Sequence, residues 1–179
     1  MKHISLFIIL FAVLLSSCNK REVESDNPGE KVEGFRPVYM DPDEAKDLSV
    51  KGAQPLEDPG KIYWYYNYVF LTDKGKGVHV IDIADPSNPQ KKAFIKIPGV
   101  NDVAVKSNFL YADNVSDLVI FNINNMDAIT FTDRIEDVYP VDQQMYPSGV
   151  TGYFECVDTT KGVVVDWQKV KLEDPKCQK

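Results

Sequence analysis

Two short apolar strands joined by a tight turn recur along this chain, and the spacing of the copies limits what it can fold into. The copies pair the runs 68–73 with 77–83, 108–113 with 117–123 and, in a degraded form, 153–158 with 162–166. Asp113 lies 40 positions after Asp73, at the same point of the repeat. A period of about 40 residues made of short strands is typical of β-propeller blades rather than of helical arrays.

The second copy outlines one complete unit. Its expected strands are 100–106, the innermost, then 108–113, 117–123 and the outer 128–134. The predicted fold class is all-β, a partial β-propeller-like stack of about two to three four-stranded antiparallel blades. The blades are expected at 60–98 and 99–140, with an incomplete one at 141–179.

The repeat region is too short to close a ring. Residues 60–179 hold about three units, whereas a closed propeller typically needs at least 4 blades. We therefore expect an open stack whose end sheets expose faces that a closed ring buries, and large exposed apolar faces usually mark contact sites. Four explanations stay open: self-association, a protein partner, a covering segment of this chain, or truncation of a longer protein.

The third strands carry a family resemblance. Val78-His-Val-Ile-Asp82 resembles the LVIVD repeat, and Leu118-Val-Ile-Phe-Asn122 resembles it with Phe121 and Asn122 as departures. Residues 95–113 are similar to a blade junction of LVIVD-repeat propeller lipoproteins. The resemblance implies a short or truncated member of that family, with a propeller fold and export from the cytoplasm, and it implies no chemistry.

The N-terminus resembles a bacterial lipoprotein signal. The apolar run from Ile4 to Leu15 has the length of a signal-peptide core and is shorter than the roughly 20 residues that span a membrane. Leu15-Ser-Ser-Cys18 resembles a lipobox, which implies a signal peptide at 1–17 and lipidation of Cys18. Asn19, in place of aspartate, implies outer-membrane delivery. We expect a lipid-anchored protein of the bacterial cell envelope, periplasmic or surface-exposed; the alternative is a plain secretory signal with an incidental cysteine.

Residues 18–59 are acidic and rich in proline. Prolines donate no hydrogen bond to a sheet, and few apolar residues are present to offset the entropy of ordering. The segment is therefore predicted to be a solvated tether that separates the domain from the lipid. Within it, a short helix near 43–48 is expected, with Asp41 as its cap and Pro42 in its first turn.

Four consecutive aromatic residues are the main candidates for ligand binding: Tyr63, Trp64, Tyr65 and Tyr66. Aromatic rings at the rim of a propeller can stack on sugar rings, although aromatic residues in strands more often pack in a core. Strand alternation places Tyr63 and Tyr65 on one face and Trp64 and Tyr66 on the other, so only one pair is expected to be exposed.

The sequence offers almost no catalytic equipment. His79 is the only histidine after the signal segment, and it is expected to pack between blades with one ring nitrogen satisfied. Asp73, Asp113 and Asp158 occupy equivalent repeat positions; they either cap the turn before the third strand or hold a cation, and capping is the preferred interpretation. No hydrolase, metalloprotease or phosphate-loop motif is present. We expect no enzyme activity, no cofactor and no metal site.

Cys156 and Cys177 remain once Cys18 is lipidated. In an oxidising compartment, a bridge between them would close a loop of about 20 residues and contribute about 3 kcal/mol in the loop-entropy model. Two separate thiols or an intermolecular bridge are the alternatives.

The charge balance bears on partners. With 27 acidic against 20 basic residues the formal charge is −7, which argues against nucleic-acid binding. The resulting hypothesis is a lipid-anchored envelope protein whose propeller-type repeats serve protein interaction or scaffolding. The alternative hypothesis is a surface glycan-binding accessory lipoprotein that uses the aromatic cluster.

Overall fold

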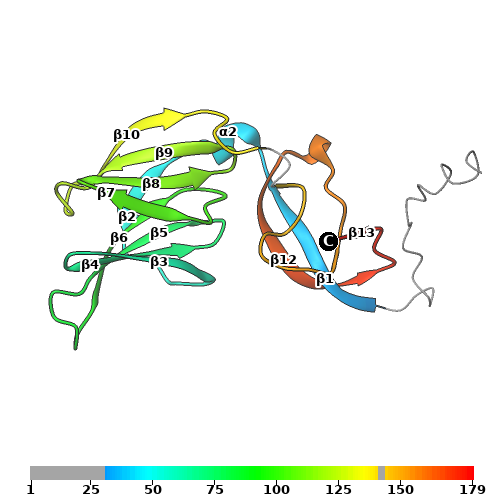
Figure 1. The fold of residues 1–179 in the computed structure, drawn as a ribbon, viewed down its shortest axis with the longest axis horizontal. Coiled ribbons are helices and arrows are strands. Elements are labelled where there is room, and N and C mark those ends of the chain that lie inside the picture. Colours follow the sequence, from blue (N-terminus) through cyan, green and yellow to red (C-terminus); the bar gives the residue numbers. More distant parts are fainter. Residues whose placement is uncertain (1–30, 141–143) are drawn as a thin grey trace, which may run out of the picture.

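The computed structural model describes residues 31–140 and 144–179, and its strands form three separate sheets. Figure 1 shows two of them stacked face to face, with the third beside the stack. The predicted signal segment and Cys18 lie outside the described residues. Within the described part of the chain, none of the helices has the length and apolar character needed to cross a bilayer.

The first stacked sheet, called blade 1, has five strands. Four follow each other as antiparallel neighbours: β3 (Pro59–Tyr65), β4 (Tyr68–Asp73), β5 (Gly77–Asp82) and β6 (Gln90–Lys96). The fifth, β2 (Ser49–Gly52), pairs antiparallel with β6 at the outer edge. Blade 1 is therefore a complete propeller-type unit that has gained one strand from the preceding segment.

The second stacked sheet, called blade 2, repeats the order with four strands. They are β7 (Val103–Lys106), β8 (Phe109–Asn114), β9 (Asp117–Asn122) and β10 (Thr130–Ile135). All neighbours are antiparallel. The prediction of an all-β fold with partial propeller-like blades is confirmed, and the number of blades is two.

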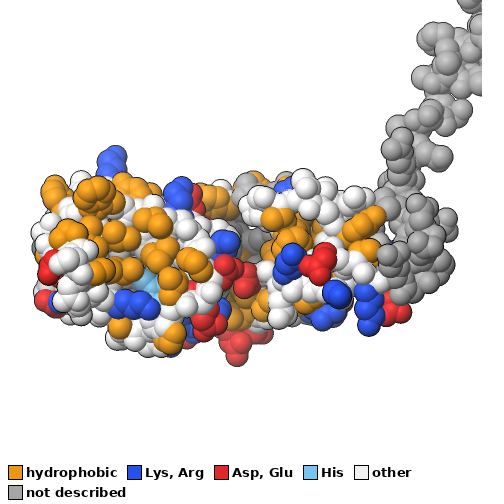
Figure 2. All heavy atoms as spheres, turned by 90° about the horizontal axis from the view of Figure 1, so that it is seen from below, with side chains coloured by type: hydrophobic (Ala, Val, Ile, Leu, Met, Phe, Trp, Pro, Cys, Tyr) orange, Lys and Arg blue, Asp and Glu red, His pale blue; other side chains and the backbone are white. Residues whose placement is uncertain are grey.

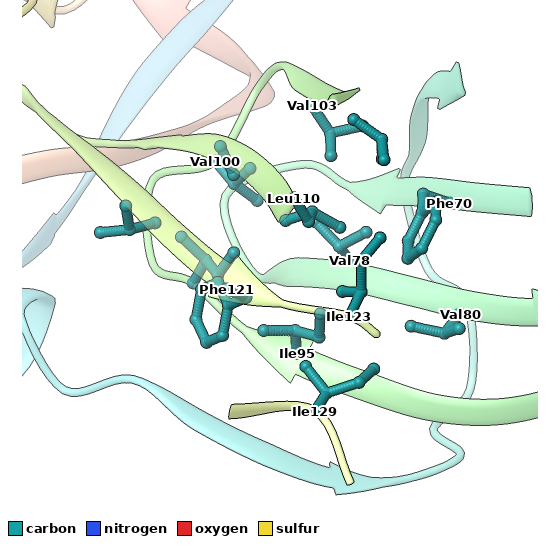
Figure 3. Close-up of a cluster of buried hydrophobic side chains, with 14 of the residues drawn as sticks. Phe70, Val78, Val80, Ile95, Val100, Val103, Leu110, Phe121, Ile123 and Ile129 are labelled. Atoms are coloured by element: carbon teal, nitrogen blue, oxygen red, sulfur yellow. The ribbon is translucent and has the colours of Figure 1, made fainter. Parts of the chain in front are cut away.

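The core lies between the two blades, and strand alternation builds it. Val78 and Val80 point inward from β5, while Val119 and Phe121 point inward from β9, and all four are fully or almost fully buried. Figure 3 shows side chains of the two sheets pointing toward one another, among them Phe70, Ile95, Leu110 and Ile123. Full burial of such a side chain contributes about 1.5–3 kcal/mol, so this interface supplies most of the apolar stabilisation of the stack.

The third sheet, called sheet A, is where the structure departs most from the expected organisation. Its strand order is β12 (Val163–Glu173), β1 (Lys31–Met40), β11 (Tyr153–Phe154) and β13 (Cys177–Gln178). β1 runs antiparallel to β12 along its whole length and parallel to β11. The third copy predicted at 141–179 is thus not a blade, because its long strand pairs with the N-terminal β1 instead of folding back on itself.

The interpretation of 18–59 as a solvated tether is wrong for residues 31–52. Pro37 is tolerated because β11 pairs only with Gly34 and Phe35, which leaves that edge of β1 free where the proline lacks its N–H. Gly34 allows the three strands to approach closely, since an added Cβ would lie 2.6 Å from a Leu172 methyl group and 2.7 Å from the Tyr153 carbonyl oxygen. Pro37 and Gly34, two residues that are unfavourable in most strands, are thus both compatible with the strand β1.

The short helix predicted within this segment is present as α2 (Pro42–Ala45). Asp41 is its N-cap: the carboxylate accepts hydrogen bonds from the amides of Asp43 at 2.8 Å and Glu44 at 3.4 Å. Pro42 stands in the first turn, as expected. The helix ends at Ala45, earlier than the predicted 48.

A buried polar network fixes α2 to blade 2. Arg134 donates to Asp117 and to Asn114, both at 2.6 Å, and to the Lys46 carbonyl oxygen at 3.1 Å. Asn114 in turn donates to the carbonyl oxygens of Ala45 and Pro98. The Asp117 side chain is only 7% exposed, so its charge depends on Arg134 for compensation.

Cys156 and Cys177 are joined by a disulfide, with their Cα atoms 5.3 Å apart. The bridge lies beside the two-residue pairing of β11 with β13, in which Phe154 faces Cys177. Since this pairing alone is short, the covalent link is the main restraint on the C-terminal end of the described chain.

Candidate functional site

The four aromatic residues of the cluster do not form one platform. The Tyr63 hydroxyl donates to the Val105 carbonyl oxygen at 2.9 Å, and the Tyr65 hydroxyl donates to the Ser107 carbonyl oxygen, so both rings reach toward blade 2. Trp64 and Tyr66 are 74% and 79% exposed. The predicted alternation holds for Tyr63, Trp64 and Tyr65, whereas Tyr66 follows the end of β3, in the turn before β4, with a φ of 50° and its ring edge-on to Tyr65 at 4.6 Å.

Trp64 belongs to an apolar outer face of blade 1, and Tyr66 lies beyond the end of β3. Ile62, on the same side of β3 as Trp64, is 65% exposed and pairs with Leu71. From Trp64 the outer face continues across the sheet to Val69 on β4 and Ile81 on β5, which are half-buried. Figure 2 looks at the molecule from this side and shows hydrophobic side chains gathered over the blades. No other described sheet of the stack covers this face.

A cleft of about 650 Å³ lies on another side of the stack, along the first strands of both blades. This is where a closed propeller has its central channel. Strand β12 closes the cleft: an added Cβ at Gly75, in the β4–β5 turn, would lie 2.7 Å from the Val165 carbonyl oxygen. Five half-buried aromatic side chains line the cleft: Tyr63, Tyr111, Tyr139, Tyr146 and Trp167.

Acidic groups dominate the polar lining. Lys61 pairs with Asp102 at 3.2 Å, while Asp113 and Asp166 have no cationic partner within salt-bridge distance among the described residues. Burial raises the pKa of Asp113 above its ordinary value, although the amides of Asp102 and Asn101 act in the opposite direction. Burial, together with the charge of Asp58, raises the pKa of Asp166.

The pKa of the Tyr139 hydroxyl is affected by the same acidic groups. Burial raises this pKa, and the charges of Asp113 and Asp102 raise it further. The phenol therefore stays protonated at neutral pH and remains a hydrogen-bond donor. One more donor, the Gln144 side-chain nitrogen, is buried in this lining and has no protein partner.

The repeated aspartates do not cap the turn that follows them. Asp73 accepts hydrogen bonds from the amides of Glu57 and Asp58, and Asp113 accepts the equivalent bonds from Asn101 and Asp102. Each carboxylate thus holds the chain entering the first strand of its own blade. Asp158 is not equivalent, because it caps a short 3₁₀ helix by accepting from the Thr160 amide. Among the described residues, no three His, Cys, Asp or Glu side chains are grouped to hold a metal ion.

His79 is fully buried, and one of its ring nitrogens is satisfied, as predicted, but it does not pack between the blades: it alternates with Val78 and Val80, which face blade 2, and so lies on the opposite side of β5. Nε2 lies 3.3 Å from Asp73 Oδ2, and Nδ1 has no partner. The ring also contacts Phe94, with a centroid distance of 4.8 Å. With no solvent access and no nucleophilic side chain beside it, His79 supports packing rather than catalysis.

The fold and these surfaces define an open, propeller-type β-repeat protein. Within it, residues 61–94 and 99–135 match the family model of the LVIVD repeat, and the two matches coincide with blades 1 and 2. The two blades are therefore LVIVD repeats, as the third strands suggested, and the LVIVD repeat does not define an enzyme family. Among curated proteins and solved structures, none matches the chain.

Most of the residues that line the cleft could not be predicted from the sequence. Tyr63 was a candidate as part of a continuous aromatic run, but Tyr111 lies in a blade strand where an aromatic residue is ordinary. Tyr139 and Tyr146 follow the second blade, and Trp167 comes from β12. Only the packing of β12 against the blades brings these rings together, and no periodicity encodes that contact.

Proposed function

We propose that this protein is an exported, lipid-anchored envelope protein whose blades serve protein interaction, with a second copy of the chain as the partner. The observation that carries the proposal is the outer face of blade 1, where Ile62 and Trp64 are 65% and 74% exposed, next to Tyr66, which is 79% exposed in the turn after β3. In a closed propeller a neighbouring blade would bury this face. The same face of a second copy offers a sheet of matching shape and apolar character, which gives a two-fold symmetric contact. Anchoring both copies in one membrane favours their encounter.

Replacing Cys18 by alanine is expected to abolish lipidation, because the cysteine sulfur is the acyl acceptor in the lipobox that the N-terminus resembles. Metabolic labelling with a fatty-acid analogue, followed by membrane fractionation, measures the effect. The matched control is Cys156→Ala, which should keep the label since that sulfur forms the disulfide. Label in the Cys18→Ala protein at the wild-type level would refute the anchoring proposal.

Replacing Trp64 by serine is expected to convert a dimer into a monomer, because it removes the largest exposed apolar side chain of the outer face. Sedimentation of the full-length lipoprotein in detergent gives the molecular mass of each protein, and the dissociation constant should rise by at least about tenfold. Ile135→Ser is the control, as Ile135 is 48% exposed on β10 of the other blade. A wild-type protein that sediments as a monomer at micromolar concentration, or a dimer equally weakened by both substitutions, would contradict the proposed interface.

A further inference from the structure

The cleft between the blades and β12 has no role in the proposed dimer, since it lies along the first strands rather than on the outer face of blade 1. Its volume of about 650 Å³ is within the range of small-molecule sites, about 300–1,000 Å³. Five partly accessible aromatic side chains line it, and the ring of one of them, Tyr146, is covered by the Lys179 ammonium group at 4.0 Å. The cleft therefore has the size and the apolar surface of a ligand site.

The polar groups of the cleft include both acceptors and donors. Asp113 and Asp166 already accept backbone amides, and each carboxylate still has lone pairs left for a ligand. The Gln144 side-chain nitrogen is a buried donor without a protein partner, a state that costs about 1–3 kcal/mol if it is not relieved. A ligand suited to this lining must donate hydrogen bonds to carboxylates and also accept one from an amide.

These requirements separate the ligand classes. A simple alkylammonium or polyamine ion would satisfy the carboxylates and the aromatic faces, but it has no acceptor for Gln144. An anion would meet Asp113 and Asp166 at close range, where like charges repel. A sugar hydroxyl both donates and accepts, and the C–H face of a pyranose ring suits an aromatic ring.

We propose that this cleft binds a neutral carbohydrate, with Tyr111, Tyr139 and Trp167 as stacking surfaces and with Asp113, Asp166 and Gln144 as hydrogen-bonding groups. The site differs from the aromatic run that first suggested glycan binding, because it keeps only Tyr63 of that run. Its residues come from blade 1 (Tyr63), from blade 2 (Tyr111), from sheet A (Trp167) and from positions after blade 2 (Tyr139 and Gln144). No single repeat therefore contains the site.

The chain provides its own reporters for a test, since it has two tryptophans, Trp64 on the outer face and Trp167 in the cleft. The Trp64→Phe protein, full length and in detergent, retains Trp167 as its sole tryptophan. It is titrated with short neutral oligosaccharides of glucose, mannose, galactose and xylose. We expect a saturable change in Trp167 emission with at least one of them, and no change in the reciprocal Trp167→Phe protein, which reports from Trp64.

Three further variants locate the site. Tyr139→Ala and Gln144→Ala should each weaken binding by about tenfold, because one removes a stacking ring and the other the unpartnered donor. Tyr66→Ala, which removes a ring of the same type from the turn after β3, outside the cleft lining, should leave binding unchanged. Circular dichroism and thermal melting of each variant verify folding.

Three results would overturn the proposal. The first is the absence of a saturable Trp167 response to every sugar of the panel. The second is a Trp167 response to spermidine alone, which would assign the cleft to cations. The third is sugar binding that is lost in Tyr66→Ala and kept in Tyr139→Ala and Gln144→Ala, which would move the site out of the cleft.

Discussion

Replacing residues 31–40 by a glycine–serine sequence of the same length is expected to unfold sheet A and to leave the two blades folded. β1 lies between β12 and β11, and β12 has no other strand partner in the sheet. Without β1, the eleven residues of β12 lose their ladder of hydrogen bonds, and β11 and β13 remain as a two-residue pairing held by the disulfide.

Hydrogen exchange of the backbone amides measures this effect. Amides of β12 should lose protection and exchange at the rate of an unfolded chain, while those of β8 and β9 should keep wild-type protection. The blades thus serve as the internal control within the same molecule. Continued protection of β12 in the replaced protein would mean that β1 is not its essential partner.

Replacing Arg134 by alanine is expected to lower the free energy of unfolding by about 3–5 kcal/mol, because it leaves the buried Asp117 carboxylate without its counter-ion. The same change removes the hydrogen bonds from Arg134 to Asn114 and to the Lys46 carbonyl oxygen, and so loosens α2. Urea denaturation at pH 7 gives the value. Lys161→Ala, which removes an exposed lysine paired with Asp158 at 3.9 Å, should cost less than about 1 kcal/mol.

The effect of Arg134→Ala should also depend on pH. Burial acts to raise the pKa of Asp117, but the hydrogen bonds from Arg134 and the Asp137 amide and the Arg134 charge prevail, so that pKa lies below its ordinary value of 3.8. The carboxylate therefore stabilises the wild-type fold above about pH 3.8, and this contribution is lost as the pH falls through the folded-state pKa. In the variant only burial and weaker partners remain, so the difference between the two proteins should shrink on acidification. A difference that stays constant from pH 7 to pH 3 would contradict the assigned role of Arg134.

The blades could be predicted because their information is local and repeated. Each third strand is a short apolar run, each turn has its own polar residues, and a shift of 40 positions superposes the copies. The alternation along β3 was sufficient to assign Trp64 to the exposed side and Tyr63 and Tyr65 to the other, while Tyr66 lies in the turn beyond the strand. The cap of α2 was equally local, because Asp41 and Pro42 determine the start of the helix by themselves.

Sheet A and the cleft could not be predicted for the opposite reason. Val163–Glu173 has as its partner Lys31–Met40, more than a hundred positions earlier, and in β1 the strand pattern is masked by Pro37 and by charged residues. The apparent third repeat was misleading because the runs 153–158 and 162–166 have the residue pattern of a blade, whereas the strands there are Tyr153–Phe154 and Val163–Glu173 and belong to sheet A. The cleft forms only where β12 packs against the blades. Because the position of β12 could not be predicted, the cleft could not be predicted either.

Strand β1, an inner strand of sheet A, would also add to the distance between the blades and a membrane if the proposed anchoring holds. For a chain held through Cys18, the path to the blades runs along β1, ten residues fixed in extended form with a strand on each side for part of their length. At about 3.3 Å per residue, this segment spans roughly 33 Å, whereas a flexible coil of equal length has a typical end-to-end distance of about 18 Å. Residues 31–40 are thus a stiff part of the domain rather than a flexible tether, and their direction relative to the blades is set by the pairing of β1 with β12.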